Sequence, residues 1–285
     1  MTSDEKGSRI QKPESTLAAP WAPGRRILLL IAHPDDEVVG CCAAIGRARA
    51  AGAEVFGYVL TTGVPAREVL WCWQRGGHTA RIATRREECR AVAALLGLSL
   101  VELQDLPTRT LRTSLLDVRG RLLDTLARRG MDTVWAPAYE GAHTDHDSAN
   151  VLASSLSSGP QKADVRVFEY AEYNFFGGAV RSQSFPRTFG TETVLELSPE
   201  EVQRKRQAMA LYCSAQRDLG YVRLERECLR PLAVYDYGQA PHAGTLFYQR
   251  FQWVFFRHPR VDYTRPEEAC RDFAGFRCAL GTNGG

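Results

Sequence analysis

Lysine is scarce in this chain of 285 residues. Only four of its 36 basic side chains are lysines, at positions 6, 12, 162 and 205, which leaves 32 arginines. Because 33 acidic side chains bring the net charge to +3, the charge does not favour a nucleic-acid surface. The sequence also lacks any apolar run near the ~18 residues that a membrane-spanning helix needs. We therefore expect no nucleic-acid partner and no membrane span.

The eight cysteines lack the spacing of a zinc or disulfide framework, and no C-x-x-C occurs. In a chain of this length such cysteines are typical of reduced, mostly buried thiols. Arg25 and Arg26 precede a short apolar run, but that run ends in charged residues rather than in the small residues of an export signal. These features predict a cytoplasmic protein.

The composition is that of an ordinary globular protein, with 44% hydrophobic and 24% charged residues. Residues 1–24 are polar and aperiodic, which predicts a disordered N-terminal tail. A single domain is predicted for 25–258, with a sheet core at 25–170 and a small C-terminal lobe at 171–258. Residues 259–285 are interpreted as a C-terminal tail.

Short apolar segments alternate with segments of helical periodicity. The expected strands are 27–32, 55–60, 99–103, 133–136 and 165–170. The expected helices between them are 37–51, 80–96, 115–127 and 147–156. This alternation predicts an α/β fold, a Rossmann-like doubly wound and mostly parallel sheet with helices on both faces. With the common strand order 3-2-1-4-5, the first and fourth strands flank the crevice where such sheets bind ligands.

Two clusters of histidine and aspartate follow these two strands, A-H-P-D-D-E at 32–37 and H-T-D-H at 143–146. A catalytic zinc takes three ligands of the His or carboxylate kind and leaves one position for water. One His and one Asp from the first cluster, with one His from the second, supply that set. A remaining Asp is available to accept a proton and a remaining His to donate one.

A simpler interpretation exists for each cluster alone. Acidic residues at a helix start cap the helix and complement its dipole. A single histidine such as His146 is more often a surface or hydrogen-bonded side chain than a ligand. Neither explanation accounts for two such clusters at the same crevice, so the pair favours a metal site.

The two clusters resemble the signatures of the LmbE-like, PIG-L-type N-acetylglucosaminyl deacetylases, which are zinc enzymes that remove acetyl groups. The resemblance extends over about residues 26–216, through further matches at Arg85, Glu88, Leu96, Gly97, Asp105, Lys205, Tyr212 and Gln216. It implies removal of the acetyl group from a compound that contains N-acetylglucosamine, with release of acetate and a free amine.

Carried over by position, the resemblance implies that His33, Asp36 and His146 hold one Zn²⁺ ion per chain. It implies that Asp35 is the general base that takes a proton from the attacking water. The substrate is then a small amino sugar or a glycoconjugate bound in the crevice.

The resemblance also implies that His143 is the acid toward the leaving amine and the partner of the oxyanion, with Asp145 orienting it. Arg85 and Asp105 would contact the sugar. His242, in a turn-rich stretch, is a further candidate for substrate contact or an ordinary loop histidine.

One position departs from the family pattern. Members that make thiols carry a tyrosine two residues before the first His of the second motif, where this chain has Gly141. Either Tyr139 substitutes as the oxyanion donor, or the zinc and His143 suffice. Trp71 and Trp73 lie in a long connection that forms a lid over the pocket or packs against the C-terminal lobe.

Two other functions remain as alternatives. The first is an amidase that cleaves a larger conjugate at the same zinc site. The second is a non-catalytic α/β module that binds a nucleotide or sugar, but no G-x-G-x-x-G or P-loop pattern follows any expected strand. The sequence does not set the number of subunits.

Overall fold

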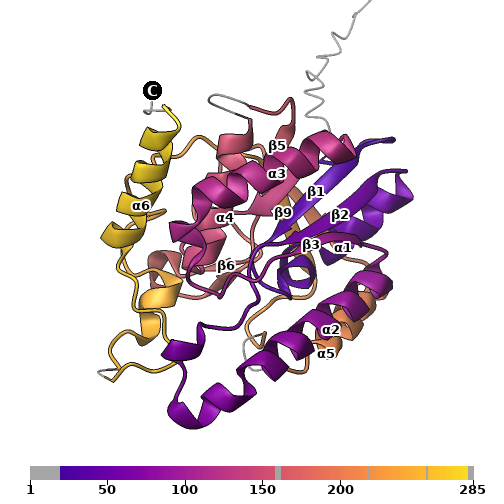
Figure 1. The fold of residues 1–285 in the computed structure, drawn as a ribbon. Coiled ribbons are helices and arrows are strands. Elements are labelled where there is room, and N and C mark those ends of the chain that lie inside the picture. The colour runs from indigo at the N-terminus through magenta and orange to yellow at the C-terminus, as the bar shows by residue number, and fades with distance from the viewer. Residues whose placement is uncertain (1–19, 158–161, 217–218, 255, 282–285) are drawn as a thin grey trace, which may run out of the picture.

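The computed structural model describes residues 20–157, 162–216, 219–254 and 256–281 (Figure 1). The first 19 residues of the predicted N-terminal tail lie outside this range. Over the described residues the strands are β1 (Arg26–Ile31), β2 (Glu54–Val59), β3 (Ser99–Leu103), β4 (Thr133–Pro137), β5 (Arg166–Tyr170), β6 (Tyr173–Asn174), β7 (Arg181–Ser182), β8 (Thr193–Glu196) and β9 (Arg226–Pro231). The α-helices are α1 (Asp36–Ala50), α2 (His78–Leu96), α3 (Leu115–Arg129), α4 (Thr144–Leu156), α5 (Pro199–Leu211) and α6 (Pro266–Ala279).

The main sheet has the strand order β3-β2-β1-β4-β5-β9-β8 over the described residues. The first five of these strands run parallel, while β9 pairs antiparallel with both β5 and β8. The predicted α/β class, with its mostly parallel sheet, is confirmed. Strands β1 and β4 are neighbours, so the loops that follow them open on the same edge of the sheet.

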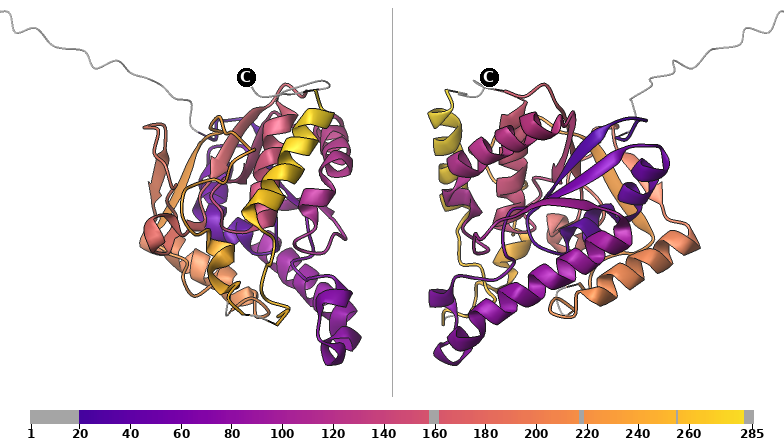
Figure 2. Two further views of the ribbon diagram at one scale, coloured as in Figure 1. Left: turned by 90° about the vertical axis from the view of Figure 1, so that its left-hand side faces the viewer. Right: turned by 45° about the vertical axis from the view of Figure 1, so that its right-hand side comes forward.

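The apolar residues of β1 alternate between two cores. Ile27, Leu29 and Ile31 pack with residues of α1, α2 and α5, whereas Leu28 and Leu30 pack with residues of α3, α4 and α6. Because successive side chains of a strand point to opposite faces, this continuous apolar run needs a helical layer on each side. The two layers are seen on either side of the sheet in Figure 2.

The C-terminal third is built into this architecture. Strands β8 and β9 extend the main sheet, and α5 packs against α1 and α2. Residues 266–279, in the segment that we predicted to be a tail, instead form helix α6, which begins with Pro266 and packs on α4. Its buried Phe273 and Phe276 cover one face of the sheet, and such apolar positions at helical spacing distinguish a docked helix from a tail.

Lys205 of α5 is buried and ties three elements together. Its Nζ lies 2.9 Å from a carboxylate oxygen of Glu227 on β9 and donates to the carbonyl of Val39 in α1, at 2.8 Å. The Glu227 carboxylate in turn accepts from the amides of Ala43 and Ala44 at 3.0–3.1 Å. Buried backbone groups need such partners, so the pair fixes α1, which begins at the first histidine–aspartate cluster.

Over the described residues, no helix combines the length and the apolar character that crossing a membrane requires.

Candidate metal centre and cavity

The loop between β1 and α1 has a strained and tightly bonded backbone. Asp35 has a φ of 131°, a value that residues other than glycine rarely adopt. The Asp36 carboxylate accepts from the His33 amide at 2.7 Å, and the Arg85 guanidinium donates to the Pro34 carbonyl at 2.6 Å. Arg85 also pairs with Asp35 at 3.2 Å. Strain of this kind persists only where surrounding bonds hold it, and it is concentrated at functional sites.

A side chain in the first turn of α4 holds the loop between β4 and α4. The Asp147 carboxylate accepts from the amides of Glu140 and Gly141 at 3.2 and 3.0 Å. Gly141 has a φ of 70°, and a Cβ there would lie 2.8 Å from the side chain of Leu246. A tyrosine at this position would be strained by the backbone and would require Leu246 to shift, so the local geometry suits the glycine that is present.

Three donor atoms, one from the β1–α1 loop and two from the first turns of α1 and α4, face one another. His33 Nδ1 lies 3.1 Å from His146 Nε2, and Asp36 Oδ1 lies 3.4 Å from His146 Nε2 and 3.9 Å from His33 Nδ1. Ligands at tetrahedral angles around zinc, at bond lengths near 2.1 Å, are separated by about 3.4 Å. The three separations fit a single ion of that kind, and His33, Asp36 and His146 form one of the groups of side chains close enough to share a metal. We call these three residues the donor cluster.

The far side of each imidazole faces a carboxylate. His33 Nε2 lies 2.9 Å from Asp145 Oδ2, and His146 Nδ1 lies 3.6 Å from Glu172 Oε2. Carboxylates in this position fix the ring orientation of metal-binding histidines and leave the other ring nitrogen free for the ion. Both carboxylate oxygens of the buried Glu172, and the His146 Nδ1 atom that faces them, have no closer hydrogen-bond partner within the described part of the chain.

The charges around His146 favour a cation. Burial alone would lower the pKa of His146, but Glu172 and Asp36 raise it to about 10. In the same way burial would raise the pKa of Asp36, yet His146 and His33 lower it. A site that stabilises a protonated imidazole between carboxylates has the electrostatic character that a divalent cation requires.

Asp145 is placed differently from what the family resemblance implied. Its Oδ2 lies 3.6 Å from His143 Nδ1, farther than from His33, and it accepts from the Thr108 hydroxyl at 2.8 Å and the Arg109 amide at 2.6 Å. The contact with His143 is made by the backbone, since the Asp145 amide donates to His143 Nδ1 at 3.1 Å. Asp145 is thus foremost a partner of His33.

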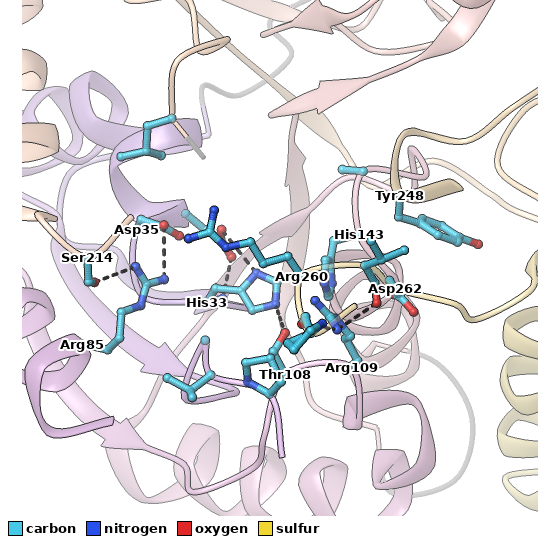
Figure 3. Close-up of a pocket in the computed structure, with 18 of the residues that line it drawn as sticks. His33, Asp35, Arg85, Thr108, Arg109, His143, Ser214, Tyr248, Arg260 and Asp262 are labelled. Carbon is cyan, nitrogen blue, oxygen red and sulfur yellow. Dashed lines mark hydrogen bonds and ion pairs between the residues drawn. The ribbon is translucent and has the colours of Figure 1, made fainter. Parts of the chain in front are cut away.

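Asp35 and His143 lie beside the donor cluster on the wall of a cavity of about 820 Å³ (Figure 3). Burial raises the pKa of Asp35 to about 6 against the opposing charge of Arg85. Burial and the neighbouring His33 lower the pKa of His143 well below its usual range, so its imidazole is neutral at pH 7. Both side chains border the space that a ligand would fill.

The structure brings Arg85 to this cavity but leaves out two other predicted contacts. Asp105 is 89% exposed in its side chain and pairs with Arg86 on the protein surface. His242 is buried beside Phe176, with Nδ1 near the Ala243 carbonyl, and does not line the cavity. Turn-rich sequence around His242 was not sufficient to place it at the site.

Tyr139, the alternative oxyanion donor, is also directed elsewhere. Its hydroxyl donates to the Gln239 carbonyl at 2.6 Å, and its ring packs with Tyr235, Tyr237 and Phe273. Of the two possibilities stated above, the one that relies on Tyr139 is not supported by this geometry.

Several residues of the site were missed. Thr108 follows β3 and Glu172 follows β5, so both stand where a parallel sheet places ligand-binding groups, and that rule could have identified them. Pro259, Arg260, Val261 and Asp262 also line the cavity, although they fall in the predicted tail. No short motif marks them, because contacts distant in sequence bring them there.

The chain is similar to known proteins in its motif region and in its fold. Residues 28–157 match the family described as PIG-L: GlcNAc-PI de-N-acetylase. This segment holds both clusters, so the predicted resemblance to that family is confirmed over these residues. A comparison with curated protein sequences gives no match.

Three solved structures illustrate the likeness of fold. A deacetylase of the teicoplanin biosynthesis pathway superposes with a TM-score of 0.59 at 19% identity, covering 74% of this chain and 99% of that one. GalB, the 4-carboxy-2-hydroxymuconate hydratase of Pseudomonas putida, gives 0.51 at 16% identity, with coverages of 74% and 97%. The N,N'-diacetylchitobiose deacetylase of Pyrococcus horikoshii gives 0.50 at 19% identity, with coverages of 70% and 76%.

Proposed function

We propose that this chain is a zinc-dependent hydrolase that removes the acetyl group from an N-acetylated amino sugar, either a small molecule or a glycoconjugate. The products are acetate and a free amine. The observation that carries this proposal is the donor cluster, whose three facing atoms lie 3.1–3.9 Å apart at the edge of an open cavity.

His33, Asp36 and His146 would hold the ion. A bound zinc supplies Lewis acidity, which polarises an amide carbonyl and makes water a nucleophile near neutral pH. The set of two imidazoles and one carboxylate is a ligand set that catalytic zinc sites use, and it leaves a coordination position open.

Asp35 and His143 would move the protons. Asp35 is held by Arg85 at 3.2 Å and lines the cavity, so it is available to take a proton from the attacking water. His143 packs edge to face against His33, with ring centroids 4.5 Å apart, and also lines the cavity. There the neutral imidazole is placed to hydrogen-bond to the oxygen that gains charge. Once it has taken up a proton during the reaction, it would protonate the departing amine, which leaves poorly as an anion.

Asp145 acts in this scheme as a positioning residue. Its carboxylate orients His33 and its amide orients His143, so one residue links the donor cluster to the proposed acid. Arg85 positions Asp35 in the same way, through their ion pair.

The substrate class rests on the family and on relatives of the same fold. The matched family is described as a GlcNAc-PI de-N-acetylase, and two of the similar structures are named deacetylases. GalB shares the fold and is named a hydratase, so the fold alone does not select the reaction. The eight free cysteines, five of them buried, support the cytoplasmic location.

Acetate release tests the proposal. Purified protein would be incubated with N-acetylglucosamine and with its glycosides, with and without a chelator, and acetate would be measured enzymatically. We expect release that the chelator abolishes and that added Zn²⁺ restores. Cleavage of bulky amides without cleavage of N-acetyl sugars would instead support the amidase alternative, and metal-independent binding without turnover would support a binding module.

A further inference from the structure

We propose that the cavity takes a substrate with a negatively charged group, a carboxylate or a phosphate, and that Arg260 binds that group. This inference rests on the proposed function for the identity of the reacting amide, but its observations come from a different part of the cavity.

The charged side chains that line the cavity are mostly basic. Five arginines line it, at 81, 85, 109, 250 and 260, against three aspartates at 35, 36 and 262. A bound zinc ion would make the balance more positive. Cationic groups along a cleft with low-dielectric walls raise the local concentration of anionic ligands.

Two of these arginines already have partners. Arg85 pairs with Asp35, and Arg109 donates to the carbonyls of Pro259 and Val261 at 3.0 Å each. The other three, Arg81, Arg250 and Arg260, form no ion pair with a carboxylate within the part of the chain that the structure describes. No carboxylate of the described residues therefore competes with a ligand of the cavity for these three side chains, of which Arg81 and Arg260 are exposed.

Arg260 is the best positioned of the three because its turn is tied to the loops of the metal centre. The two bonds from Arg109 hold the carbonyls on either side of it. The next residue but one, Asp262, accepts from the hydroxyl of Thr144 at 2.7 Å. The Arg109 amide also donates to Asp145, and Thr144 directly precedes Asp145 in the chain. Because Asp145 contacts His33, the turn is fixed relative to the donor cluster.

The side chain of Arg260 extends from this turn across the cavity toward His33 and Asp35 (Figure 3). Arg250 stands on the same wall, with its guanidinium 4.6 Å from the ring centroid of Phe247 and 5.2 Å from those of Phe175 and Phe251. Stacking of this kind holds a guanidinium by its face and leaves its N–H edge free. Arg250 thereby adds a second positive charge to the part of the cavity that Arg260 lines.

A guanidinium presents its N–H groups as a planar fork that matches either a carboxylate or a phosphate. The two sources are distinguished with three sugars that share the same acetamide: N-acetylglucosamine, N-acetylmuramic acid with a carboxylate, and N-acetylglucosamine 6-phosphate. Affinities would be measured by calorimetry on the zinc-loaded protein, and kcat/KM by acetate release.

We expect at least one charged sugar to bind about tenfold more tightly than the neutral one, as a charge-assisted hydrogen bond provides. R260A should abolish that preference and R260K should retain part of it. R257A, which removes an exposed arginine three residues away that does not line the cavity, should leave it unchanged. An anion that binds only the metal would keep its advantage in R260A.

Equal affinity for the three sugars would overturn the inference, as would a preference that survives R260A. An Arg260-dependent preference without acetate release would sustain the anion subsite and overturn the deacetylase proposal. Acetate release with the same kcat/KM for all three sugars would sustain the deacetylase proposal and overturn the anion subsite.

Discussion

The donor cluster and the outer wall of the cavity, which we define as Arg81, Arg250, Phe251 and Arg260, are built in different ways. His33, Asp36 and His146 come from two four- to six-residue motifs at the ends of neighbouring strands, and Asp36 and His146 are fully enclosed. The outer wall comes from α2 and from a segment beyond residue 245, and much of it is open to solvent.

The difference shows where chemistry and selectivity reside. Metal ligands need fixed geometry, which strand ends and helix starts of a rigid sheet provide locally. Selectivity for the rest of a substrate is left to loops that vary without disturbing the sheet. Changes in the donor cluster should therefore affect the metal and turnover, whereas changes in the outer wall should affect substrate preference.

Removal of a ligand should give the largest effect. We expect H146A to lose its bound metal and to release acetate at least about a thousandfold more slowly, since several kcal/mol of transition-state stabilisation depend on the ion. Metal content would be measured by atomic emission and folding by circular dichroism. H242N is the matched control, because His242 lies outside the cavity, and it should keep both metal and rate. Full activity of H146A would show that a metal held by His146 is not needed for the reaction.

Asp35 should separate turnover from metal binding. D35N should keep the zinc content of the parent but slow acetate release by about a hundredfold to ten-thousandfold, the usual contribution of a general base. D105N removes a carboxylate from the exposed surface pair with Arg86, and such pairs contribute little, so its rate should equal that of the parent. An unchanged rate in D35N would remove Asp35 from the mechanism.

Glu172 should show a graded effect on metal affinity. Since its carboxylate lies 3.6 Å from His146 Nδ1, E172Q should weaken zinc binding by about tenfold to a hundredfold while turnover at saturating zinc is largely kept. Competition with a chromophoric chelator would measure the affinity. E196Q, at an exposed position of β8, serves as the control. Equal affinities in E172Q and the parent would mean that Glu172 does not support His146.

The sequence allowed the sheet and the donor cluster to be predicted for one physical reason. Short-range signals govern both: continuous apolar runs mark buried parallel strands, and the first motif follows β1 directly while the second follows β4 after a short loop. The strand order then requires these ends to meet. These local signals and the common strand order were enough to bring the two motifs together, and the family resemblance then singled out His33, Asp36 and His146 as ligands.

The outer wall and the C-terminal helix could not be predicted in this way. Arg260 reaches the cavity because Arg109 and Thr144, more than a hundred residues earlier, bind its turn. The ends of α6 were readable from Pro266 and the apolar spacing of Phe273 and Phe276, but its docking on α4 was not. Asp105 illustrates the opposite error, since a position after a strand does not fix the direction of an exposed side chain.

Trp73 should give the smallest effect and define the limit of the outer wall. Its side chain is 74% exposed and stacks on Trp71, with ring centroids 5.3 Å apart, and neither ring lines the cavity. W73A should therefore change the free energy of unfolding by less than about 1 kcal/mol and leave kcat/KM nearly unchanged. F251A, which removes an aromatic ring from the outer wall, should raise KM severalfold with little change in kcat. Urea unfolding and acetate-release kinetics on both variants would measure this. If W73A raised KM as much as F251A, the segment around Trp71 and Trp73 would cover the cavity during turnover, and the outer wall would extend to it.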